Sequence, residues 1–176
     1  TVYERPFEVV YVEDINDMPE EKGCSVPAGG FLKGNRVGFD AGGSDIKISA
    51  VVDGEVIFSQ EVIWLPKLNE DINYHYEHIY NAMMLAIDKM GGKCDGIGIS
   101  TAGVIIDNRP MVSSLFIKVP KADFEKVKGV YINTCERIAK DLGYDIPYLV
   151  ANDGDVSALA GALDLKDTCV MGIAMG

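Results

Sequence analysis

Three short stretches of the sequence carry residues that could bind or transform a charged ligand, and each follows a predicted strand. The first, residues 40–47, reads Asp-Ala-Gly-Gly-Ser-Asp-Ile-Lys. Glycines allow unusual dihedral angles and bring backbone N–H groups close to a ligand, which suits phosphate. Asp40, at the end of its strand, could hold Mg²⁺, usually through water. Taken alone, however, a Gly-Gly turn favours an ordinary hairpin with solvated charges.

The second stretch, residues 151–155, reads Ala-Asn-Asp-Gly-Asp and precedes a predicted helix. Asp153 lies at the carboxyl end of a strand, where open α/β sheets place their ligand crevice. A carboxylate in that place can accept the proton of an attacking hydroxyl. Helix capping is the structural alternative, because Asp and Asn are favoured N-caps, and Asp155 fits that role.

The third stretch, residues 98–103, reads Gly-Ile-Ser-Thr-Ala-Gly and has small polar residues that could line a site. A buried strand that ends in a tight turn explains the same residues equally well. His75 and His78, with Glu77 between them, could ligate a metal. Two histidines three residues apart without a third ligand are more often surface or cap residues.

Hydrophobic periodicity predicts the elements that must position these stretches. Asp53-Gly54 is a strong hairpin signal, so the first three strands should form an antiparallel meander. Gly129 weakens the middle of the second long helix. The predicted elements, in order, are a strand at 9–12, strands at 37–40, 46–52 and 56–64, a helix at 72–90, a strand at 97–100, a loop or hairpin through 107–110, a helix at 121–142, a strand at 148–151, a helix at 156–163 and a strand at 169–174.

Composition limits the class of protein. With 176 residues and 48% hydrophobic content, the chain can bury a core the size of one domain or one lobe. Its net charge of −11 argues against nucleic acid or an anionic membrane as partner, since both require clustered cations. The four cysteines are spaced too widely for a zinc signature. Free thiols, no membrane-spanning run and no signal peptide predict a cytoplasmic protein.

Together with Gly-Ile-Ala-Met-Gly at residues 172–176, these stretches occur in the order and rough spacing of a sugar-kinase lobe. The sequence resembles the N-terminal lobe of the ROK family, bacterial sugar kinases and related repressors within the actin-like, Hsp70-like and hexokinase-like ATPase superfamily. The resemblance covers about residues 36–176, which leaves 1–35 as an extension with a short strand and a loop. It implies an α/β, ribonuclease H-like lobe: a mixed sheet with an antiparallel three-strand meander and helices on both faces.

The resemblance also implies roles for residues. ATP·Mg²⁺ would bind between two such lobes with the sugar beside it, Asp153 would be the catalytic base, and Asp40 would lie near the metal. The implied ATP- or phosphate-binding positions are Asp40, Gly42, Gly43, Ser44, Lys47, Gly172 and Gly176. The implied substrate-binding positions are Asn152, Thr101, Gly103, Ser113 and Ser114.

Three functions remain open. The leading one is transfer of the ATP γ-phosphoryl group to a sugar hydroxyl; the others are an ATP-driven conformational switch or activator, and a non-catalytic sugar-binding regulatory relative. Asp155 stands where a second Asn is common in the family, and Ala162 where a Glu often ends the pattern. Because no helix-turn-helix precedes residue 36, a repressor is not expected. The expected partners are a sugar and an absent C-terminal lobe, and homodimerisation stays open. The chain alone is expected to fold and to be inactive as a kinase.

Overall fold

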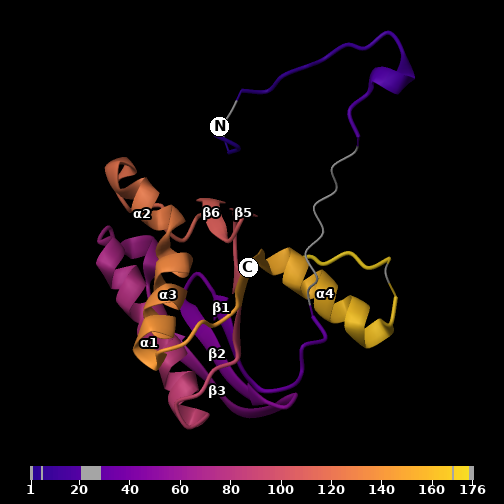
Figure 1. Cartoon of the computed structure of the whole chain (residues 1–176). Helices are drawn as coiled ribbons and strands as arrows, with labels where there is room; N and C mark the ends of the chain where they lie inside the picture. The colour runs from indigo at the N-terminus through magenta and orange to yellow at the C-terminus, as the bar shows by residue number, and fades with distance from the viewer. Residues whose placement is uncertain (1, 5, 21–28, 168, 175–176) are drawn as a thin grey trace.

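The computed structural model describes residues 2–4, 6–20, 29–167 and 169–174, and its centre is a five-stranded mixed sheet (Figure 1). The strands lie in the order β3-β2-β1-β4-β7. They are β1 (Asn35–Ala41), β2 (Asp45–Val52), β3 (Glu55–Ile63), β4 (Gly96–Thr101) and β7 (Tyr148–Asn152). The first three are antiparallel neighbours, whereas β4 pairs in parallel with β1 and β7. The predicted meander and mixed sheet are therefore confirmed.

Helices cover both faces of the sheet (Figure 1). The long helices α1 (Ile72–Lys89) and α3 (Val130–Leu142) pack on one face, and α4 (Asp153–Leu165) lies on the other. The predicted second helix breaks at Gly129 into α2 (Phe124–Lys128) and α3, as the glycine suggested. The smaller elements are the 3-10 turns η1 (Ile15–Asp17), η2 (Pro66–Leu68) and η3 (Lys121–Asp123), and the hairpin strands β5 (Val104–Ile106) and β6 (Arg109–Val112).

The hydrophobic core lies between the sheet and α1 with α3. Alternate side chains of each strand point to opposite faces, so Phe39 of β1 and Ile48 of β2 are buried against the helices. Ile79 and Met83 of α1 and Ile138 of α3 fill the same layer and have no exposed surface. The opposite alternate positions of β1, β2 and β4 face the side on which α4 lies, and they include the small and polar residues Gly38, Asp40, Lys47, Ser49, Gly98 and Ser100.

Two predicted strands do not form. Residues 9–12 have a strand-like composition, but residues 6–20 run away from the lobe and contain only η1 (Figure 1). Val10 and Tyr11 are 75% and 92% exposed. Residues 169–174 are also irregular, and Met171 is 79% exposed. A strand needs a hydrogen-bonded neighbour and a face to bury, and neither segment finds them within the described residues.

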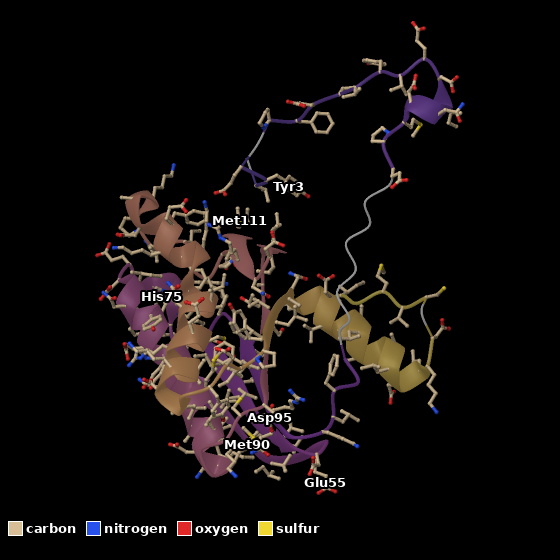
Figure 2. All side chains as sticks on the ribbon, in the orientation of Figure 1. Tyr3, Glu55, His75, Met90, Asp95 and Met111 are labelled. Atoms are coloured by element: carbon tan, nitrogen blue, oxygen red, sulfur yellow. The ribbon has the colours of Figure 1, made fainter. Side chains whose placement is uncertain are left out.

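His75 of α1 is a core residue with no exposed surface, so the expectation of a surface residue is wrong for it (Figure 2). Its ring nitrogens lie 2.9 Å from the Asp71 carbonyl and 3.1 Å from the Pro66 carbonyl. The half-buried His78 ring lies 2.7 Å from the Tyr74 carbonyl. No group of three His, Cys, Asp or Glu able to hold a metal occurs among the residues that the structure describes. Across the same residues, no helix has the length and apolar character needed to cross a bilayer.

Candidate functional site

The three predicted stretches meet at one edge of the sheet. In the parallel register, Asp40 of β1 lies opposite Ser100 of β4, and Thr101 lies opposite Asn152 of β7. The three strands therefore end side by side, and the loops that follow them share the carboxyl edge. This edge is the candidate functional site.

The glycine turn between β1 and β2 is closed by the Gly42 N–H, which donates to the Asp45 carbonyl at 2.9 Å. Neither Gly42 nor Gly43 has a positive φ, so the expectation of unusual dihedral angles is wrong at these two positions. Glycine is needed at residue 42 because of close approach: an added Cβ would lie 2.7 Å from the Asp45 carbonyl oxygen. A tight turn of this kind keeps its backbone within reach of a ligand.

Asp40 and Lys47 are partners across β1 and β2, and both face the side of α4. Lys47 Nζ lies 3.4 Å from Asp45 Oδ1, so its charge is shared with a carboxylate of the turn. Asp40 is half-buried and forms no ion pair with any described residue. An unpaired carboxylate at a strand end has the chemistry to hold Mg²⁺, which takes one or two carboxylates and completes its octahedron with water and phosphate oxygens.

Trp64 anchors the glycine turn to the core. Its indole N–H donates to the Gly42 carbonyl at 2.8 Å, and its backbone N–H donates to the Ser44 carbonyl at 3.1 Å. The side chain is 1% exposed and meets the His75 ring edge-on, with the ring centroids 6.1 Å apart. One buried residue therefore binds the turn at two of its carbonyl groups. Nothing in the local sequence signals this contact, because it joins residues that only the meander brings together.

Thr101 lies on the core side of β4 and is fully buried. Its hydroxyl is 2.8 Å from the phenol of Tyr131 on α3, which is also buried. Burial raises the pKa of Tyr131, so this phenol stays protonated at neutral pH. A substrate contact from Thr101 would have to use its backbone, since its side chain ties β4 to α3.

Gly103 and Asn152 connect the ends of β4 and β7. Asn152 is the N-cap of α4 and accepts a hydrogen bond from the Gly154 N–H at 2.8 Å, while its Nδ2 donates to the Gly103 carbonyl at 2.8 Å. The prediction that Asp155 caps this helix is wrong, because α4 begins earlier, at Asp153. The oxygen and the nitrogen of the Asn152 side-chain amide both form hydrogen bonds within the protein. A sugar that contacts Asn152 would have to share these atoms with those hydrogen bonds.

Asp153 is the first residue of α4 and lies directly beyond the end of β7. One carboxylate oxygen, Oδ1, is 2.9 Å from the Gly154 N–H. The other oxygen accepts no hydrogen bond from the described part of the chain, and the residue is half-buried. This geometry leaves one oxygen able to accept a proton from a ligand at the sheet edge.

The remaining predicted site residues divide into three groups. Gly172 lies against the first turns of α4, because a Cβ there would be 2.1 Å from the Gly154 carbonyl oxygen. Ser113 lies beside Gly103, and its hydroxyl accepts from the Leu115 N–H at 3.3 Å, whereas Ser114 is exposed in the same loop. Gly176 lies outside the described residues.

A groove of about 580 Å³ runs along the face of the sheet beneath α4. Asp40, Lys47 and Asp155 line it together with small and apolar residues, which are Gly29, Gly38, Phe39, Ile48, Ser49, Ser59, Gly98, Ile99, Ser100, Leu149, Ala151, Val156 and Leu159. Its walls are mostly apolar, so phosphate has few donors there. The part of the groove that suits a charged ligand is the end at Asp40.

Comparison with solved structures shows which fold this arrangement belongs to. The ROK hexokinase from Thermus thermophilus matches with a TM-score of 0.50 and 20% identity over 73% of this chain and 37% of its own. A protein assigned as a sugar kinase from Cytophaga hutchinsonii matches with a TM-score of 0.53 and 17% identity over 73% of this chain and 39% of its own. No protein-family model and no curated protein matches the sequence. The chain spans less than two fifths of the length of these two structures and shares a ribonuclease H-like fold with the part of each that it matches.

Proposed function

We propose that this chain is one lobe of an ATP-dependent sugar kinase of the ROK type, which transfers the γ-phosphoryl group of ATP to a sugar hydroxyl. The observation that carries the proposal is that β1, which carries Asp40, and β7, which Asp153 directly follows, end at the same edge of the sheet. Asp40 stands beside a glycine turn and has no ion-pair partner among the described residues. At the start of α4, one oxygen of Asp153 accepts no hydrogen bond from those same residues. The fold alone would not decide between a kinase and a switch.

In this proposal each group has a separate task. The backbone N–H groups of Gly43 and Ser44 would face the phosphates, since the Gly42 N–H closes the turn on the Asp45 carbonyl. Asp40 would hold Mg²⁺, which when bound neutralises phosphate charge. Asp153 orients the acceptor hydroxyl and takes its proton. Phosphoryl transfer depends mainly on positioning and electrostatic stabilisation, so a rigid turn and a fixed helix start suit the task. The Trp64 contact and the Asn152 cap supply this rigidity.

A second lobe is part of the proposal. The chain covers 37% of the ROK hexokinase and 39% of the Cytophaga hutchinsonii protein, and its net charge of −11 leaves no excess of cations to balance a triphosphate. A facing lobe would close the cleft, exclude water and supply further contacts to the nucleotide. Residues 1–176 alone are therefore expected to bind nucleotide weakly and to transfer no phosphate.

The direct test is phosphoryl transfer by a protein that joins residues 1–176 to its second lobe. With γ-labelled ATP, Mg²⁺ and a panel of hexoses and N-acetylhexosamines, we expect label to appear on at least one sugar. Hydrolysis of ATP that no sugar stimulates but a protein partner does would contradict a kinase and favour a conformational switch. Sugar binding without any ATP binding would favour a regulatory relative.

A further inference from the structure

Lys67 lies against the glycine turn although it belongs to a different segment, η2. A Cβ added to Gly43 would be 3.1 Å from Lys67 Nζ and 3.4 Å from its Cε. The ammonium group thus occupies the space beside the tip of the turn that a side chain at residue 43 would take. Glycine at position 43 leaves room for this cation.

The segment that carries Lys67 is fixed to α1 by several hydrogen bonds. The Leu65 N–H donates to the Tyr74 phenol at 3.2 Å, and the Pro66 carbonyl lies 3.1 Å from the His75 ring. Asn69 donates through its side chain to the Leu65 carbonyl at 2.8 Å. Trp64, the residue that clamps the turn, directly precedes this segment. The backbone of Lys67 is therefore held in place beside the turn, and only the side chain adjusts.

The charge of Lys67 is not neutralised by the described residues. No carboxylate among them lies within 4.0 Å of its Nζ, whereas Lys47, the other lysine near the turn, lies 3.4 Å from Asp45. In a chain of net charge −11, a lysine whose ammonium group lies beside Gly43 without a carboxylate partner among the described residues is placed to attract an anion. Lysine serves phosphate as a compact point charge.

We propose that Lys67 binds a phosphate oxygen of the nucleotide held by the glycine turn, and that Lys67 rather than Lys47 is the principal cation of this lobe for that ligand. The proposal rests on the proposed function, because it takes the turn at residues 42–44 as the phosphate site. It adds to that function a residue outside the turn. The fold brings this residue close to the ligand, although it is not part of the sequence motif.

The test uses the single tryptophan of the chain as its reporter, since Trp64 contacts the turn directly. Residues 1–176 are titrated with Mg·ADP and with tripolyphosphate at 0.15 M salt while Trp64 fluorescence is followed. We expect Lys67→Met to weaken binding of both ligands by about fivefold, as for loss of one partly screened contact to phosphate. Lys67→Arg should restore most of the affinity.

Lys93→Met is the matched control, because Lys93 is exposed and lies just before β4, at the opposite end of the strand from the turn. It removes the same charge and should change affinity by less than twofold. If the wild-type chain binds and Lys67→Met leaves the affinity unchanged, or lowers it no more than Lys93→Met does, the role of Lys67 is wrong. The proposal that the turn binds phosphate would not be affected by that result. No binding of either ligand by the wild-type chain at concentrations up to about 1 mM, the upper end of ordinary KM values, would overturn the phosphate turn and the role of Lys67 together.

Discussion

Asp153→Asn is expected to lower kcat by about a thousandfold in a protein that joins this lobe to its second lobe. An amide has the shape of the carboxylate but cannot accept the proton of the sugar hydroxyl. KM should change little, because Asn still forms a hydrogen bond to the hydroxyl. Folding should be unaffected, since the side chain accepts one hydrogen bond, from the Gly154 N–H, which Asn152 also serves. Initial rates at saturating ATP and sugar, with melting temperatures of both proteins, measure this.

Asp155→Asn provides the control for that experiment. Asp155 lies in the first turn of the same helix and lines the groove, so its replacement removes the same charge close by. We expect its kcat to stay within about threefold of wild type, because a neighbouring charge acts through solvent and is screened. A kcat for Asp153→Asn within tenfold of wild type would exclude Asp153 as the base.

Gly103→Ala is expected to destabilise the lobe by about 3 kcal/mol or more. Gly103 has a φ of +123°, a conformation that L-residues rarely adopt, and an added Cβ would lie 2.0 Å from the Val112 carbonyl oxygen. Since that atom belongs to the backbone of the β5–β6 hairpin, it cannot swing away. Relief of the contact would also move the Gly103 carbonyl from Asn152, and with it the start of α4. Urea unfolding of residues 1–176, followed by circular dichroism, measures the loss.

Gly143→Ala is the control for Gly103→Ala, because it introduces the backbone strain of a positive φ without a steric clash. Gly143 ends α3 with a φ of +83°, but a Cβ there would meet no atom within 4 Å. Its replacement should cost about 1 kcal/mol, the price of a left-handed residue alone. Equal losses in the two variants would contradict the packing of Gly103 against the hairpin.

Much of the lobe could be predicted from local patterns. The Asp53-Gly54 turn, where both residues have positive φ, defined the meander, and the apolar spacing of residues 72–90 defined α1. Gly129 interrupted the second helix as expected. These features depend on neighbours in sequence, so composition and periodicity reveal them. The strands expected at 9–12 and 169–174 do not form, and local sequence could not reveal this. A strand forms only where the tertiary structure offers it a partner.

The site could be predicted less completely. The order of strands placed Asp40 and Asp153 at one edge, because parallel strands end together. The contacts of Trp64 and Lys67 with the turn could not be foreseen, because they depend on how the segment after β3 folds back over α1. The role of Thr101 was also hidden, since a one-residue difference in strand register decides whether its hydroxyl faces a ligand or Tyr131.

The central claim is that the glycine turn binds the phosphates of a nucleotide. Amide NMR spectra of ¹⁵N-labelled residues 1–176, recorded during titration with Mg·ATP, test it most directly. We expect the largest shift changes at the amides of Gly42, Gly43 and Ser44, with smaller changes near Asp153 and none on the far faces of α1 and α3. Saturable changes confined to other regions, or none at the turn, would contradict the account.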